Sequence, residues 1–289
     1  MASPQTWATV IDSSTDATFR TWGSEFGSFA TLCGLVQTAD TGQINWTTVV
    51  RNTAAAGYEI WRLVDSTLFM KIEYGGAGAT TTPMMWATVG TGSNGSGTLT
   101  GQTCTRAQIF SGLLPTNTTT AFVSYMSRTA DSFSFAFKTG GGSSAAYNVG
   151  SFIVGKTVDG TGAATTTGFA VLRQEANTAL SFQCVRTVAT ATTFSDLTSG
   201  AVALPGLPTS SLTAAGAFQA YELWMNVPEV QPYIWAAAVL TAEIPRSVSY
   251  QAAMAGSTLR TYVSLGSTNG GGNVMGFSQA LYSWAMIYE

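Results

Sequence analysis

Three glycines in one short stretch have the spacing of a phosphate-binding loop. Gly90, Gly92 and Gly95 follow the apolar run MWATV in the order G-x-G-x-x-G, which in dinucleotide-binding proteins opens a helix whose amides bind a pyrophosphate. The residues that follow, SGTLTGQTCT, are poor helix formers, and no acid lies between Glu73 and Asp131 to bind a ribose. The stretch also lacks the lysine of a P-loop. We therefore predict a tight or bulged turn between two strands, with the Asn-Gly dipeptide at its tip.

Acid–base and nucleophilic chemistry has few candidate residues in this chain. None of the 289 residues is a histidine, which excludes Ser-His-Asp and Cys-His systems and histidine-ligated zinc. Carboxylate chemistry, as in glycosidases, stays open because the chain has 15 Asp and Glu, but these form no D-x-D or E-x-x-E cluster. The lone acids with apolar neighbours are Glu59, Glu73, Glu222 and Glu229. We expect each to pair with an arginine or to lie at a rim, and we assign no catalytic, cofactor-binding or metal-binding residue.

The spacing of the cysteines and the length of the apolar runs indicate the cell compartment of the protein. Cys33, Cys104 and Cys184 are far apart and show no C-x-x-C spacing, so we expect reduced, buried thiols. The first residues have neither a basic region nor a long apolar core. The longest apolar run, YIWAAAVL, is far shorter than the ~18 residues of a spanning helix. We expect no secretory signal, no membrane partner and a cytoplasmic origin.

Charged residues are few, and this limits the possible partners. They make up 9% of the chain, while 45% of it is hydrophobic and 11% aromatic. A typical soluble protein has about 25% charged residues. The 12 Lys and Arg are scattered and the net charge is −3, so there is no basic stripe to neutralise the phosphates of a nucleic acid. We expect a hydroxyl-rich, neutral surface or one that neighbouring subunits cover.

Aromatic residues near the end of the chain are the other candidates for a functional surface. Trp224, Tyr233 and Trp235 flank the loop NVPEVQP, and Tyr282 and Trp284 belong to a terminal segment that is apolar on both faces. Such a strand is either an inner strand or is covered by another subunit. A stacking platform for sugar rings is a third interpretation. These five residues are our candidate interface or glycan contacts.

One amphipathic helix is expected near the start of the chain, over residues 17–35 or so. Apolar residues recur there at helical spacing on a single face: Trp22, Phe26, Phe29, Cys33 and Val36. Gly23 and Gly27 make this helix weak in isolation, so packing on a sheet must hold it.

The rest of the chain is typical of strands and turns. Residues 57–65 and 68–76 predict a hairpin, and in its second arm Lys71 and Glu73 would face solvent or charges on a neighbouring strand. The core-facing residues of that arm are Leu68, Met70, Ile72 and Tyr74. A later segment places Phe133, Phe135 and Phe137 on one face and Ser132, Ser134 and Lys138 on the other. The predicted fold is mainly β, with sandwich or jelly-roll-like sheets and the helix packed on one of them.

A loop rich in proline and small residues suggests how the chain divides. The loop ALPGLPTSS begins at Ala203, which predicts a β-rich N-terminal domain over 1–202 and a linker over 203–216. Residues 217–289 would form a C-terminal β segment, either separate or completing the same sandwich.

The run from Phe19 to Gly101 resembles virion structural proteins of tailed bacteriophages. The resemblance depends on the phrases GLVQTADTGQINW, FMKIEYG and VGTGSNGSG, and it covers about a third of the chain. It implies a particle component of the tail, baseplate or fibre region, with head decoration as an alternative. It supplies no catalytic or binding residues.

Three hypotheses follow from these patterns. The first is a non-enzymatic virion protein that is assembled in the host cytoplasm, acts as a homo-oligomer or in a symmetric assembly, and contacts other virion proteins. The second is a module whose exposed aromatic residues bind a host-surface glycan. The third is a carboxylate hydrolase of the tailspike kind, which would release oligosaccharides from the host envelope.

Overall fold

Antiparallel strands form most of the regular structure, in agreement with the Thr-rich and aromatic-rich segments of the chain. The computed structural model describes residues 4–12, 15–51, 54–63, 67–76, 83–102, 104–111, 119–139, 149–176, 179–186, 195–196, 202–203, 220–225, 233–240, 249–254, 258–267 and 283–289. Beyond residue 164 it describes side chains only at 259–263 and 286–289. The prediction of a mainly β fold is confirmed, with several antiparallel sheets and an N-terminal helix.

A five-stranded sheet forms the N-terminal part of the molecule. Its strands, in spatial order, are β2 (Leu35–Gln37), β3 (Ala55–Leu63), β4 (Phe69–Gly76), β5 (Pro83–Gly90) and β8 (Cys104–Ser111). Strands β3 and β4 pair antiparallel, so the predicted hairpin is confirmed. In β4, Met70, Ile72 and Tyr74 are buried on the inner face, and Lys71 and Glu73 alternate with them on the outer face.

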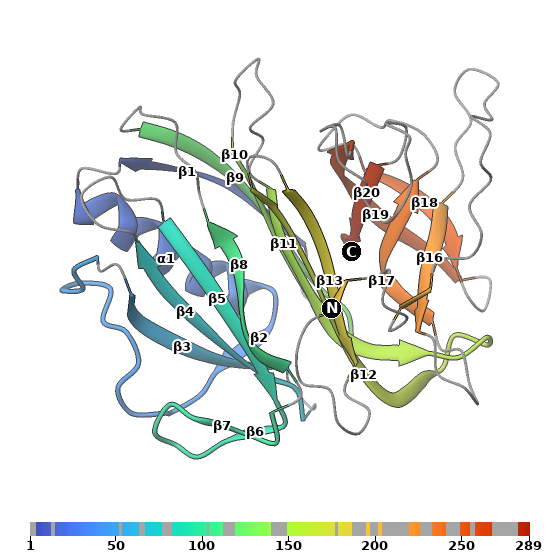
Figure 1. Cartoon of the computed structure of the whole chain (residues 1–289), viewed down its shortest axis with the longest axis horizontal. Helices are drawn as coiled ribbons and strands as arrows, with labels where there is room; N and C mark the ends of the chain where they lie inside the picture. The colour runs from blue at the N-terminus through green and yellow to red at the C-terminus, as the bar shows by residue number, and fades with distance from the viewer. Residues whose placement is uncertain are drawn as a thin grey trace.

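A much larger sheet contains thirteen strands within the residues that the structure describes. Its main path runs β1-β9-β10-β11-β17-β20-β19-β18, and β12 to β16 branch from β11 and β17. The strands of the path are β1 (Gln5–Asp12), β9 (Thr119–Arg128), β10 (Ser132–Thr139), β11 (Val149–Val158), β17 (Tyr233–Leu240), β20 (Ser283–Ile287), β19 (Thr258–Ser267) and β18 (Ser249–Met254). The branches are β12 (Ala164–Ala176), β13 (Ala179–Arg186), β14 (Ser195–Asp196), β15 (Val202–Ala203) and β16 (Ala220–Met225). In Figure 1 the five-stranded sheet and the C-terminal strands lie on opposite sides of β9–β11.

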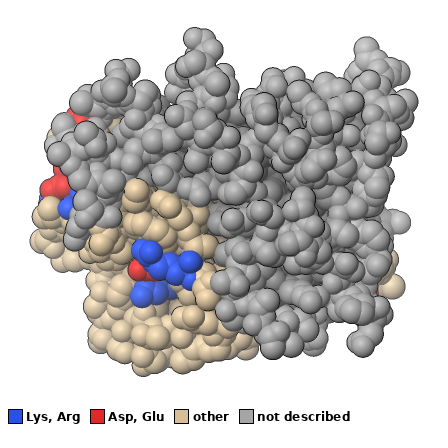
Figure 2. Space-filling model, viewed as in Figure 1, with Lys and Arg blue, Asp and Glu red and all other residues tan. Residues whose placement is uncertain are grey.

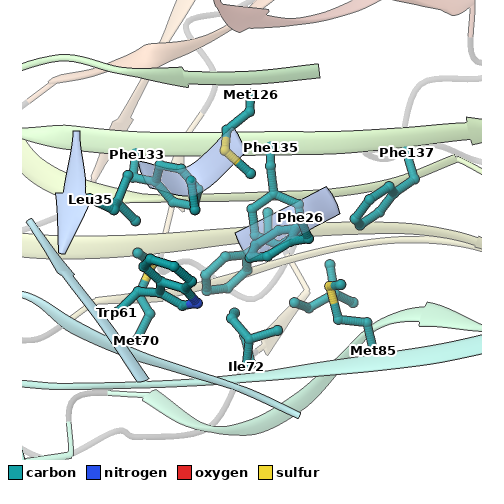
Figure 3. Close-up of a cluster of buried hydrophobic side chains, with 14 of the residues drawn as sticks. Phe26, Leu35, Trp61, Met70, Ile72, Met85, Met126, Phe133, Phe135 and Phe137 are labelled. Carbon is teal, nitrogen blue, oxygen red and sulfur yellow. The ribbon is translucent and has the colours of Figure 1, made fainter. Parts of the chain in front are cut away.

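Helix α1 (Asp16–Leu32) lies between the two sheets. The ring of Phe26 is 6.0 Å from that of Tyr74 in the five-stranded sheet and 5.2 Å from that of Phe135 in the larger sheet. Trp22 makes the same kind of double contact, 6.0 Å from Tyr74 and 5.7 Å from Phe137. Figure 3 shows Phe26 in the main core, between Phe135 and Phe137 on one side and Ile72 and Met85 on the other. The helix therefore packs on both sheets, whereas the sequence predicted packing on one.

The helix ends earlier than the apolar spacing predicts. It stops at Leu32, because Gly34 turns the chain with φ at 81° and β2 begins at Leu35. Trp22, Phe26 and Cys33 are buried as expected, but Val36 lies on β2 with 38% of its surface exposed. Its position in the helical repeat was therefore misleading.

The serine face of β10 is buried as completely as its phenylalanine face. Phe133, Phe135 and Phe137 face the helix layer, as predicted, whereas Ser132 and Ser134 point to the other side and are also inaccessible. The Oγ of Ser134 donates to the carbonyl of Ile287 over 3.3 Å. In the neighbouring strand, Ser127 Oγ donates to the carbonyl of Glu289 over 3.0 Å. Small hydroxyl side chains thus let the C-terminal segment approach the backbone of β9 and β10 closely.

The predicted linker lies outside the described residues, apart from Ala203 at the end of β15. Strand β17 pairs with β11 through Val158 and Tyr233, so one sheet contains strands from both sides of the predicted boundary. The division into 1–202, 203–216 and 217–289 stays a prediction. In the part of the chain that the structure describes, no helix has the length and apolarity to cross a bilayer.

Candidate functional site

The glycine-rich stretch forms a hairpin, as predicted, and does not open a helix. Strands β6 (Gly92–Ser93) and β7 (Leu99–Thr100) pair antiparallel, and we call residues 92–100 the glycine hairpin. Its turn is closed by the bond from Asn94 N–H to the carbonyl of Thr98, at 3.0 Å. Gly95 and Gly97 have φ values of 80° and 89°, a region that disfavours other residues.

This hairpin does hold an anion, and the anion is a carboxylate of the same chain. Asp40 is only 9% exposed. Its Oδ1 accepts from the amide of Gly97 at 3.0 Å and from the hydroxyl of Ser93, and its Oδ2 accepts from Thr38 Oγ1 at 2.5 Å. Burial alone would raise the pKa of Asp40, but these donors together hold the pKa below its ordinary value. The sequence analysis missed this contact, since Asp40 and Gly97 are 57 residues apart.

Further bonds fix the hairpin beside the outer face of the five-stranded sheet. The amide of Thr41 donates to the carbonyl of Gly95 at 2.9 Å, and the hydroxyl of Tyr58 donates to the carbonyl of Thr41 at 2.6 Å. A Cβ at Gly97 would overlap the Tyr58 ring. Asp40 belongs to GLVQTADTGQINW and Gly97 to VGTGSNGSG, two of the segments that resemble phage proteins. These two segments are therefore in contact.

Glu59 is a buried carboxylate held by aromatic donors. It is 4% exposed and faces inward from β3. Trp46 Nε1 donates to its Oε1 at 2.8 Å, while Tyr74 Oη and Trp61 Nε1 donate to its Oε2 at 2.7 and 3.2 Å. Burial raises the pKa of Glu59, and the three donors only partly oppose that rise. The expectation that Glu59 pairs with an arginine or lies at a rim is wrong, because its oxygens bind indole and phenol groups inside the core.

Glu73 belongs to a cluster of charged and aromatic side chains on the outer face of the same sheet. The cluster, which we call the charged face, contains Tyr58, Lys71, Glu73, Trp86 and Arg106. Tyr58, Glu73 and Trp86 are direct register partners across β3, β4 and β5. Arg106 Nε donates to Glu73 Oε2 at 2.7 Å, which confirms the expected arginine partner.

Each cation of the charged face lies over an aromatic ring. The Arg106 guanidinium is 4.2 Å from the Trp86 ring centre, and Lys71 Nζ is 4.4 Å from that of Tyr58. The side chain of Arg106 remains 45% exposed. Figure 2 shows basic side chains gathered beside an acidic one over the five-stranded sheet. Three of the five residues of the charged face, Trp86, Tyr58 and Arg106, are of the types enriched at the centres of protein interfaces.

A signal for the charged face is present in the sequence. The alternation in FMKIEYGG already directs Lys71 and Glu73 outward. The same period of two, applied to β3 and β5, places Tyr58 and Trp86 on that face. The register between β3, β4 and β5 was needed to show that Tyr58, Glu73 and Trp86 are neighbours.

The aromatic residues selected from the sequence are placed only as backbone. Trp224 in β16 is the register partner of Tyr233 in β17, which also contains Trp235. Trp284 in β20 pairs with Val239. The side chains of these residues, and the whole of Tyr282, lie outside the described residues. Their roles as interface or glycan contacts stay predictions.

Of the other candidate residues from the sequence, some have described side chains and others do not. Cys33 and Cys104 are buried thiols, as expected, and burial raises the pKa of Cys33 to about 12. The side chain of Cys184, the side chain of Glu222 and the whole of Glu229 lie outside the described residues. Within the described ranges, no group of three or more Cys, Asp or Glu is placed to hold a metal ion.

Comparison of the chain with models of protein families, with curated proteins and with solved structures finds no match. The resemblance to phage virion proteins therefore stays a prediction from the sequence.

Proposed function

We propose that this chain is a non-enzymatic structural component of a tailed-phage virion that acts through contacts between subunits. The proposal places it in the tail, baseplate or fibre region, in several copies, after assembly in the host cytoplasm. The observation that carries it is the charged face, a sheet surface on which Trp86, Tyr58 and Arg106 lie together.

The state of Asp40, Glu59 and Glu73 supports a structural role. Asp40 fastens the glycine hairpin, Glu59 binds three aromatic donors in the core, and Glu73 is paired with Arg106. A glycosidase needs two carboxyl groups about 5 to 10 Å apart with access to a sugar. These three acids are engaged in other bonds, and Asp40 and Glu59 are nearly inaccessible.

The alternatives remain predictions. Head decoration differs from the main proposal only in the position within the particle. The glycan-binding hypothesis depends on Trp224 and Trp235, whose side chains lie outside the described residues. The sandwich-like arrangement belongs to the proposal too, supported by the strands that contact β9 and β10 from the side opposite the helix.

Mass spectrometry of purified virions, separated into heads and tails, tests the proposal. We expect the chain in the tail fraction, in a fixed ratio to other tail proteins. A chain that is absent from washed particles would contradict a structural role, and recovery in the head fraction would favour decoration.

A further inference from the structure

We propose that the charged face is the surface through which two copies of this chain associate, related by a two-fold axis that lies in the interface, over Ile72 and perpendicular to β4. This inference rests on the proposed function, because it assigns the surface through which the repeated subunit makes one of its contacts. The occupant of the face is therefore a second copy of the same chain.

The order of charges along β4 carries the argument. Lys71 and Glu73 are two residues apart, so they lie on the same face at a separation of about 7 Å. Ile72, between them, points inward and is buried. A two-fold axis that runs between the two copies, parallel to the sheet surface and perpendicular to β4 over Ile72, reverses the strand direction across the interface. Each Lys71 then lies opposite Glu73 of the second copy, as an isologous interface requires.

The cations of the face have bonding capacity left for a partner. Arg106 uses Nε for Glu73, and its guanidinium lies over the Trp86 ring. Lys71 lies over the Tyr58 ring, so its ammonium group is held in position before association. In the pair, Glu73 accepts from its own Arg106 and from Lys71 of the second copy. The carboxylate thereby bridges two cations.

The surrounding side chains suit a contact between proteins. Tyr58 and Trp86 lie on either side of Glu73 in register, and both are partly exposed. Tyr and Trp are enriched at the centres of interfaces because they bury much area with few rotatable bonds. Mixed charges among these rings set the orientation of the two copies.

Charge inversion tests the proposal on the full-length chain. Sedimentation velocity over a range of concentrations is expected to show dimers of the wild type. Lys71→Glu and Glu73→Lys are each expected to weaken association by about tenfold or more, because each places like charges opposite one another. The variant K71E/E73K/R106E inverts the whole set, so it is expected to associate with itself again and not with the wild type.

Two further variants act as controls. Lys156→Glu, on β11, makes the same change in net charge away from the face and is expected to dimerise like the wild type. Lys71→Met removes the charge without adding repulsion, so it is expected to weaken association less than Lys71→Glu, and it also serves if Lys71→Glu fails to fold.

The proposal is overturned if the wild type stays monomeric at every concentration, or if Lys71→Glu and Lys71→Met both associate like the wild type. It is also overturned if K71E/E73K/R106E is folded but associates no better than Lys71→Glu, since the partner is then not a second copy. None of these results affects the detection of the chain in virions, which tests the proposed function separately.

Discussion

At the scale of single residues, the surroundings of Glu59 differ from those of an ordinary, solvated carboxyl. Its oxygens accept from two indoles and a phenol, and no basic side chain is among these donors. Burial disfavours its charged form, so the pKa of Glu59 is above the ordinary 4.5. The folded protein therefore holds a proton on Glu59 at pH values where the unfolded chain has released it.

This shift predicts how stability depends on pH. Its contribution is fully present below the unfolded pKa of 4.5, and it is lost as pH rises through the higher folded pKa. Glu59→Gln cannot ionise and is expected to remove this decline. Denaturant unfolding at a series of pH values measures it, with Glu73→Gln as the matched control. An unchanged decline in Glu59→Gln would show that another group causes it.

At the scale of elements, the glycine hairpin is held by contacts that its sequence does not reveal. Gly95 and Gly97 both have positive φ, but they differ in their surroundings. No atom lies within 4 Å of a Cβ at Gly95, whereas a Cβ at Gly97 would overlap Tyr58. Gly97 also donates its amide to Asp40. The same substitution at the two positions therefore separates backbone strain from lost packing.

Gly95→Ala is expected to reduce the free energy of unfolding by about 1 kcal/mol, from the backbone alone. Gly97→Ala adds the clash and is expected to reduce it by about 1–3 kcal/mol more. Chemical denaturation of both variants gives the difference. Equal effects at the two sites would mean that the Tyr58 ring moves aside without a loss of stability.

The side chains packed against helix α1 explain why it contains glycines. A Cβ at Gly23 would overlap the indole of Trp46, while a Cβ at Gly27 would lie 3.3 Å from Glu59 Oε1 and Trp61. Trp46 in turn donates to Glu59. The low helix propensity of Gly23 is thus offset by the ring that fits against it.

Gly23→Ala is therefore expected to have opposite effects in two settings. In a peptide of residues 16–32 it should raise helicity, because alanine favours a helix by about 1 kcal/mol over glycine. In the full chain it should lower the free energy of unfolding by about 1–3 kcal/mol, because the core is overpacked. Circular dichroism measures both quantities, and a more stable full-length variant would refute the packing argument.

At the scale of the whole molecule, strands β9 and β10 are covered on both sides. The phenylalanines of β10 contact helix α1, and its serines meet the C-terminal segment. Tyr288 adds a contact with the Tyr125 ring at 6.2 Å. Among the described acids, Asp40 and Glu59 are buried in specific bonds, whereas a charged group lies over the five-stranded sheet, which Figure 2 shows. The virion and sedimentation experiments above test what that surface does.

The sequence by itself determined the parts that depend on local periodicity. The alternation in β4 and β10, the helical repeat of Trp22 and Phe26, and the turn at Gly95 follow from side-chain directions within one element. The absence of histidine removed several catalytic systems on composition alone. Such features need no knowledge of which elements meet.

Only the tertiary structure decided which groups face each other. Asp40 meets Gly97 across 57 residues, and Ser134 meets Ile287 across 153. Glu59 has the same chemistry as Glu73, but one faces the core and the other the charged face, because their strands direct them to opposite sides of one sheet. The physical reason is that burial and pairing energies depend on which faces pack together, and strand register, rather than local sequence, sets those contacts.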